Sequence, residues 1–337
     1  MSENILKKNR YKNLTKNMNV KEIGLLVFMI IAMIYIQMKN PQFLTGTNIT
    51  DLLKNTSLLG MLSVGMMLVM LTGGIDLSIG AVLALSGMSA ARFVSIYPDL
   101  PVVFSLLLGM MIGIVTGLIL GLLVSKGRIN PTIASLGMMN VHRGLTYVVG
   151  NNAWISAHQM TPAFKSLSTG SLFGLNNLIL FSITTFAIFY YFLQYAKTGR
   201  NIYAVGSNYE ATSITGIATN RTIVTAYVLN GLIAGLAGVL WVSKYASAQG
   251  DTGVGYEMSV IAACVLGGVS VRGGVGKISS LILGVLMLGI LNNALPLLNI
   301  STFWEDFITG FIILVAILLN LYIQKRQKKD ALKRRAI

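Results

Sequence analysis

The residues that could support catalysis or bind a metal are few and far apart in the sequence. The chain has two histidines, His142 and His158, and a single cysteine, Cys264. Neither histidine has a partner at the spacing of a zinc site, and no HExxH, CxxC or recognisable Ser/His/Asp arrangement occurs. Cys264 lies in an apolar run and can form no disulfide within the chain. We therefore expect neither enzyme chemistry nor a metal or cofactor in this chain.

One glycine-rich stretch, at residues 273–278, is superficially like a phosphate-binding loop. Such a loop needs a glycine five residues before its Gly-Lys pair, and Val271 occupies that position here. It also needs a serine or threonine after the lysine to bind magnesium, and Ile278 stands there instead. The stretch is therefore not expected to bind a nucleotide.

Asp76 is the acidic residue that is placed most unusually. Nearly all other acidic residues lie at the edges of apolar runs, whereas Asp76 follows Gly73 and Gly74 in a short break between two of them. Its carboxylate could cap the helix that begins at Leu77, or it could line a path for a polar solute. Three amides in apolar runs leave a similar choice between a path and hydrogen bonds joining packed helices. They are Asn230, Asn292 and Asn293.

The elements that must position these residues are strongly apolar. Of the 337 residues, 54% are hydrophobic and 11% are charged, and the mean hydropathy is +0.70. This composition indicates a membrane protein, in which each spanning helix needs roughly 20 apolar residues. We predict an all-α polytopic fold with about ten transmembrane helices, some short or broken, in a single membrane domain over residues 1–337. The apolar runs cover residues 24–38, 57–72, 77–95, 101–125, 131–149, 172–195, 222–243, 256–270, 278–297 and 303–323.

The net charge of +15 is distributed unevenly along the chain. Most of the 26 basic residues lie in the tails 1–22 and 324–337 and in alternate short connections. Lysine and arginine mark the cytoplasmic side of a membrane protein, so we expect both termini in the cytoplasm, close to anionic lipid headgroups. The charge is thus interpreted as topology, and no nucleic acid partner is expected.

Glycine recurs at every fourth position of the run at residues 101–125, on one face of the predicted helix. The run at 222–243 has a similar pattern. Such bare faces let two helix backbones approach closely, so we expect both helices in the protein interior. The alternative is that the groove lets helices slide past one another. The glycines are Gly109, Gly113, Gly117, Gly121, Gly231, Gly235 and Gly238.

Two glycine-rich breaks interrupt the apolar runs at loosely corresponding places in the two halves of the chain. They cover residues 71–80 and 266–274. Broken helices at matching places are typical of internally repeated transporters. We therefore expect helices that are tilted, broken or re-entrant at both places.

The longest polar connection, residues 196–221, lies on the predicted cytoplasmic side. Residues 210–217 can form a short helix that begins near Asn208 and ends at Gly216. Ala211, Ile214 and Ile217 would then share one apolar side of it. An apolar side on a polar connection indicates a protein partner.

This connection resembles the coupling segment of the permease subunits of bacterial ABC-type sugar importers. In that segment an acidic residue, an alanine and a glycine six residues from the acid dock into a cleft of the ATPase, and Glu210, Ala211 and Gly216 match this pattern. Further motifs, over about residues 57–323, resemble the ribose, xylose and autoinducer-2 branch. These motifs lie at residues 73–78, 133–139, 143–144, 255–258, 261–268, 273–276 and 304–308.

The resemblance implies a transport function in a bacterial cytoplasmic membrane. The chain would be one of two permease subunits, identical or paralogous, served by ATPase subunits that hold ATP and magnesium and by an external sugar-binding protein. The cargo would be a pentose or related monosaccharide, with autoinducer-2 as the alternative within the family and an ATPase-independent carrier or channel as the rival class. Asp76, Asn230, Asn292 and Asn293 are the candidates for the translocation path. The residues implied to couple to the ATPase are Gly199, Arg200, Glu210, Ala211, Ile214, Gly216 and Ile217.

Overall fold

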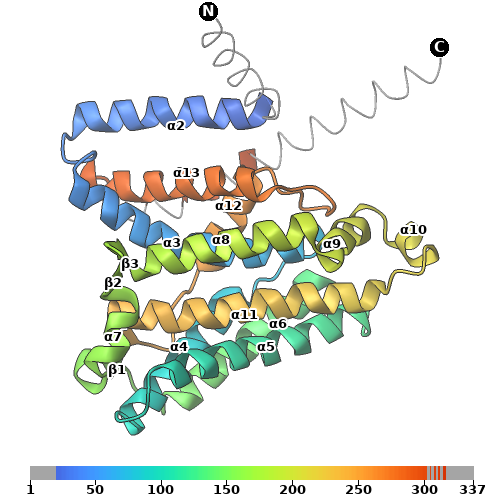
Figure 1. The fold of residues 1–337 in the computed structure, drawn as a ribbon, viewed down its shortest axis with the longest axis horizontal. Helices are drawn as coiled ribbons and strands as arrows, with labels where there is room; N and C mark the ends of the chain where they lie inside the picture. The colour runs from blue at the N-terminus through green and yellow to red at the C-terminus, as the bar shows by residue number, and fades with distance from the viewer. Residues whose placement is uncertain (1–19, 302–303, 305–306, 309, 312–313, 316–337) are drawn as a thin grey trace, which may run out of the picture.

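The structure, a computed structural model, describes residues 20–301, 304, 307–308, 310–311 and 314–315. Over this part of the chain it is a stack of helices with four two-residue strands (Figure 1). The longer helices are α2 (Val20–Lys39), α3 (Gly46–Leu71), α4 (Ile79–Ile96), α5 (Val103–Ser125), α6 (Pro131–Val149), α8 (Asn177–Tyr195), α11 (Thr219–Tyr245) and α13 (Ile278–Leu297). The shorter ones are η1 (Ala157–Gln159), α7 (Pro162–Thr169), α9 (Lys197–Ser207), α10 (Tyr209–Ile214) and α12 (Tyr256–Leu266).

The strands form two small antiparallel pairs at one end of the bundle. β1 (Ile155–Ser156) pairs with β4 (Ser247–Ala248), and β2 (Ser171–Leu172) pairs with β3 (Leu175–Asn176). Figure 1 shows β1, β2 and β3 beside α7 at the end opposite to α9 and α10. The connection between α8 and α11 and the strand-bearing segments therefore lie at opposite ends of the fold.

The predicted helical membrane fold is confirmed, but the predicted count of about ten spans is not. Seven of the described helices are long and apolar enough to cross a membrane, namely α2, α3, α4, α5, α8, α11 and α13. α12 has only 11 residues, and α6 interrupts its apolar sequence with polar side chains such as Asn140 and Arg143. The run at 303–323 is described at only a few residues, and the tails 1–19 and 324–337 lie outside the described part.

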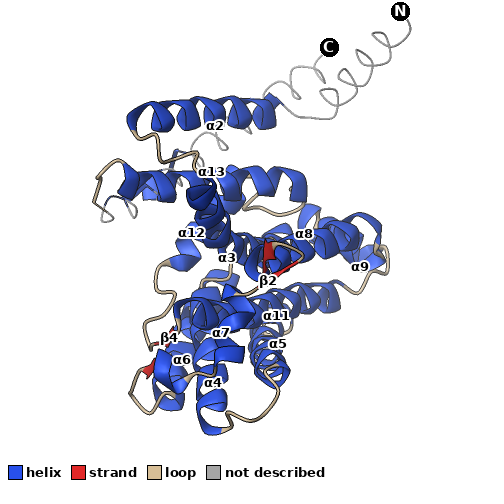
Figure 2. Ribbon diagram, turned by 60° about the vertical axis from the view of Figure 1, so that its left-hand side comes forward, coloured by secondary structure: helices blue, strands red, loops and turns tan. Residues whose placement is uncertain are grey.

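α11 is the central helix of the fold. It packs on α3, α4, α5, α7 and α9, and Figure 1 shows it running through the middle of the bundle between α8 and α5. α3 is the most deeply buried span and passes beneath the short α12, which lies between α3 and α13 (Figure 2). Side chains from α3, α4, α8, α11, α12 and α13 form the main hydrophobic core.

The glycines of α5 lie directly against those of α11, so the predicted close approach of helix backbones is confirmed, whereas the opposite face of α5 is exposed and not in the interior as predicted. A Cβ atom on Gly113 would overlap the carbonyl oxygen of Gly231, and a Cβ on Gly231 would overlap that of Gly113. Gly117 meets the backbone of Tyr227 in the same way, and on the far side of α11 Gly238 meets the backbone of α4 at Leu83. At Gly113 and Gly117, α5 and α11 thus pack backbone to backbone, with no layer of side chains between them.

A side chain on this face of α5 should therefore destabilise the fold. We expect Gly113→Leu to lower stability by at least roughly 1–3 kcal/mol, because overpacking here displaces backbone on both sides. Leucine favours helix formation and is accepted by lipid, so membrane insertion should be unaffected. Thermal unfolding in detergent measures the effect, with Met111→Leu on the exposed face of α5 as the control. Equal stability of both variants and the parent would contradict the backbone packing.

Candidate functional site

Asp76 lies in the break between α3 and α4 and is almost completely buried. α3 ends at Leu71, and Gly73 turns the chain with a φ of +87°. Asp76 Oδ1 then accepts hydrogen bonds from the backbone N–H of Ser78 at 2.8 Å and from Ser78 Oγ at 2.6 Å. The carboxylate therefore fixes the turn that leads into α4, close to the capping role considered from the sequence.

The second carboxylate oxygen joins this turn to the central helix. Asn230 of α11 donates from Nδ2 to Asp76 Oδ2 at 2.7 Å. Two residues predicted independently for the translocation path are thus direct partners, although 154 positions separate them. Asn230 is as deeply buried as Asp76, so in this conformation the pair closes a contact and does not line an open channel.

Tyr227, one turn before Asn230, completes this buried polar group and was missed from the sequence. Its hydroxyl and Asn230 Oδ1 are buried and have no hydrogen-bond partner among the described residues. A Cβ on Gly74 would come within 2.5 Å of the Tyr227 hydroxyl, and one on Gly65 would come within 2.5 Å of Asn230 Oδ1. The two glycines make room for these polar groups. Because Gly65 and Gly74 are more than 150 positions from Tyr227 and Asn230, no local sequence pattern could have predicted these contacts.

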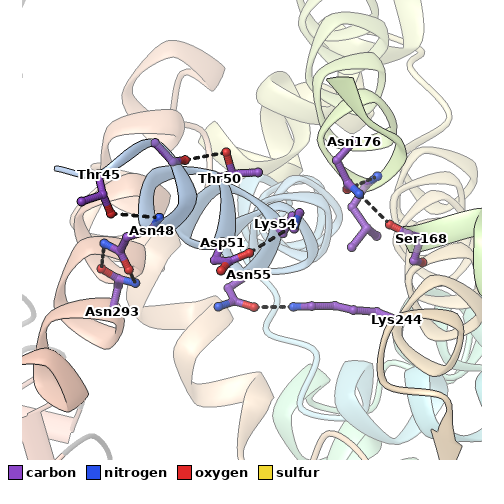
Figure 3. Close-up of polar contacts among 12 residues, drawn as sticks. Thr45, Asn48, Thr50, Asp51, Lys54, Asn55, Ser168, Asn176, Lys244 and Asn293 are labelled. Carbon is purple, nitrogen blue, oxygen red and sulfur yellow. Dashed lines mark hydrogen bonds and ion pairs between the residues drawn. The ribbon is translucent and has the colours of Figure 1, made fainter. Parts of the chain in front are cut away.

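Asn293 and Asn292 lie elsewhere, on α13. Asn293 and Asn48, at the start of α3, exchange two amide hydrogen bonds of 3.0 Å (Figure 3), and Asn48 also donates to the carbonyl of Phe43 at 2.7 Å. Asn293 thus joins two helices, which is the packing role considered for it. Asn292 is half-buried beside it. The structure does not bring either residue to the Asp76–Asn230 pair, and a role of these two in a path remains a prediction.

The connection at residues 196–221 contains the predicted short helix, α10, with its start as predicted. Asn208 accepts a hydrogen bond from the backbone N–H of Ala211 at 2.9 Å and so caps the first turn. The helix covers Tyr209–Ile214, not residues 210–217, because Thr215 ends it and Gly216 reverses the chain with a φ of +80°. Ile214 is 87% exposed at its tip.

A second helix in this segment, α9, was missed from the sequence, and it holds Gly199 and Arg200. A Cβ on Gly199 would lie 2.8 Å from the Cα of Leu193, so this glycine packs against α8. Arg200 donates to the carbonyl of Tyr195 at 2.7 Å. Glu210, Ala211, Ile214 and Gly216 are exposed together on α10 and the turn after it, and Ile217 is half-buried. The candidates on α10 and its following turn are therefore accessible to a partner, whereas Gly199 is buried against α8.

The Asp76–Asn230 hydrogen bond should contribute measurably to stability. In Asn230→Ala, Asp76 Oδ2 is left buried without this donor, which we expect to cost on the order of 1–3 kcal/mol. Asn140→Ala on α6 is the matched control, because the Asn140 amide is exposed and donates only within its own helix. Thermal unfolding in detergent should show a lower midpoint for Asn230→Ala alone. Identical midpoints for the two variants would show that the pair does not hold the break against α11.

Comparisons with known proteins extend over nearly the whole chain. The family described as "Branched-chain amino acid transport system / permease component" matches residues 48–317. The "Ribose import permease protein RbsC" of Bacillus subtilis (strain 168) is 40% identical over 301 residues, covering 89% of this chain and 93% of that protein. The "L-arabinose ABC transporter permease protein AraH" of Azospirillum brasilense is 36% identical, covering 93% and 91%. The "Ribose import permease protein RbsC" of Escherichia coli (strain K12) is 37% identical, covering 88% and 92%.

No solved structure gives a significant match. Among the described residues, no three histidine, cysteine, aspartate or glutamate side chains gather as metal ligands would. The chain has helices suited to a membrane, a buried polar group at a helix break and an exposed capped helix at one end of the bundle. Together with the family match and these identities, this shows that the chain is an integral membrane protein of the branched-chain amino acid transport system / permease component family.

Proposed function

We propose that this chain is the permease subunit of an ATP-driven importer of a monosaccharide. The observation that carries this proposal is the 36–40% identity, over about nine-tenths of the chain, to permeases named for ribose and L-arabinose. These names favour a pentose over autoinducer-2, the other cargo that the sequence resemblance left open. The chain itself would carry out no chemistry, and ATP and magnesium would bind to the partner ATPase.

The ATPase would dock on α10. This helix places the acidic Glu210 beside the exposed apolar Ile214, at the end of the bundle that also carries α9. The excess of lysine and arginine on this side supports its placement in the cytoplasm, with the whole subunit in the bacterial cytoplasmic membrane. The external binding protein would then approach the opposite end, near β1 to β4. A second permease subunit, identical or paralogous, would complete the path.

The geometry supports transport by alternating access. Asp76 and Asn230 are hydrogen-bonded to each other and buried in the present conformation, so a solute can reach them only when α4 and α11 separate at the break. A hydroxyl-rich sugar could then exchange hydrogen bonds with the carboxylate and amide, and would be released when the pair forms again. Asn292 and Asn293 are further candidates for such contacts along the path. Such exchange requires two states whose balance the ATPase sets.

Reconstitution into vesicles tests this function against that of an independent carrier or channel. With the ATPase, the binding protein and ATP present, the vesicles should take up ribose or L-arabinose. This uptake should cease when ATP or the binding protein is omitted. Equal uptake by the purified chain alone would establish the rival class. Uptake of autoinducer-2 in preference to both pentoses would overturn the assignment of cargo.

The docking site is tested most directly at Ile214. Gly216 is less suitable because its positive φ makes any side chain there disturb the turn itself. Ile214→Asp should weaken ATPase binding at least about tenfold, because it replaces an apolar contact worth roughly 1.5–3 kcal/mol with a charge. Ser213→Asp adds the same charge to an exposed neighbour without removing apolar surface and is the control. Equal affinity of Ile214→Asp and the parent in a binding titration would exclude α10 from the interface.

A further inference from the structure

α9 packs against both glycine-rich breaks at once. Gly206, near its end, lies on the final carbonyl of α3: a Cβ there would overlap the oxygen of Leu71 and would approach the backbone nitrogen of Gly274 to 2.7 Å. From the other side, a Cβ on Gly273 would come within 2.8 Å of the Gly206 carbonyl oxygen and 2.9 Å of the Gly73 nitrogen. Three backbone segments, α9 and the two breaks, thus meet at Gly206 without side chains between them.

Hydrogen bonds hold this junction together. The N–H of Gly274 donates to the carbonyl of Leu71 at 2.9 Å, which joins the second break to the end of α3. The hydroxyl of Tyr203, one turn before Gly206 on α9, donates to the carbonyl of Gly276 at 2.9 Å. Burial raises the pKa of Tyr203, so its hydroxyl stays protonated and remains a donor over the physiological pH range.

α9 is also joined firmly to α10. Thr212 of α10 is buried, and its hydroxyl shares its single hydrogen between the carbonyl oxygens of Ala204 at 2.8 Å and Asn208 at 2.7 Å. Asn208 ends α9 and caps α10 at the same time. A displacement of α10 is therefore passed to α9 and not absorbed by a flexible linker.

The first break continues directly into the buried pair. Gly73, which touches the junction, is three residues before Asp76, whose second oxygen binds Asn230 of α11. An unbroken series of packed or hydrogen-bonded groups thus runs from the exposed tip of α10, through Thr212 and Gly206, to the Asp76–Asn230 contact. Energetic coupling between distant sites can be carried by such a series of packed and hydrogen-bonded groups.

We propose that α9 transmits the motion of the docked ATPase to both glycine breaks, and that Gly206 and Tyr203 are the positioning residues of this contact. The inference rests on the proposed importer function. When the ATPase moves α10, α9 shifts the two breaks together and so opens or closes the Asp76–Asn230 contact. Gly206 is needed because any side chain would hold α9 away from Leu71 and Gly274, whereas Tyr203 ties α9 to the second break alone.

The test measures sugar uptake and ATP hydrolysis in the same reconstituted vesicles. Gly206→Ala should still bind the ATPase, whose docking surface on α10 is unchanged, and should still support hydrolysis. The number of sugar molecules taken up per ATP hydrolysed should fall at least tenfold. Tyr203→Phe keeps the ring but removes the hydroxyl, and its ratio should fall in the same direction by a smaller factor. Gly24→Ala, a helical glycine with open space around it, is the control and should equal the parent.

The outcomes separate this inference from the function on which it rests. If the parent complex shows no ATP-dependent uptake, the importer assignment itself fails. If the parent transports and both Gly206→Ala and Tyr203→Phe keep its uptake per ATP, transmission through α9 is refuted. If Gly206→Ala no longer assembles with the ATPase, the test rests on Tyr203→Phe. If Tyr203→Phe takes up as many sugar molecules per ATP as the parent, the junction stabilises the fold without transmitting motion, and the proposal is refuted.

Discussion

The backbone contact between α5 and α11 is the constraint on which the rest of the structure depends. Lipid chains are as apolar as the helix surfaces, so burial of apolar side chains does not drive these helices together as it would in water. Close packing and polar contacts must do so, and glycine gives the closest approach. With α5 on one side and α4 on the other, α11 is held in register, and this register points Tyr227 and Asn230 at the first break.

At the first break, some buried polar groups have hydrogen-bond partners and others do not, which suits a protein that adopts more than one conformation. Asp76 accepts three hydrogen bonds, yet the Tyr227 hydroxyl and Asn230 Oδ1 beside it are buried without partners among the described residues. Each such group costs about 1–3 kcal/mol relative to a satisfied one. A conformation that supplies partners, from solute or water, recovers this energy and partly offsets the separation of Asp76 from Asn230.

Short-range sequence patterns predicted the features that depend on neighbouring residues, namely apolar helices, a glycine face and the ends of a short helix. Apolar runs located the membrane helices, the four-residue glycine period located the face of α5 that a neighbouring helix approaches closely, and Asn208 with Gly216 bounded the short helix α10 nearly correctly. The start of α3 was placed too late because its first two turns are polar, with Asp51 and Lys54 paired on the surface. α9 was missed because its two glycines and polar residues are poor helix signals, and packing against α8, α11 and the breaks stabilises it. The pairing of Asp76 with Asn230 joins residues too distant in sequence for any pattern to reveal.

α2 lies at the edge of the helix bundle and apart from its centre (Figure 1). Among the described helices its chief contact is α13, its exposed side is apolar, and the family match begins only at residue 48, after α2 has ended. Removing or exchanging it would leave untouched every contact among α3, α4, α5 and α11. α2 thus adds a candidate span at the edge of the fold, outside the packing of the helices around α11.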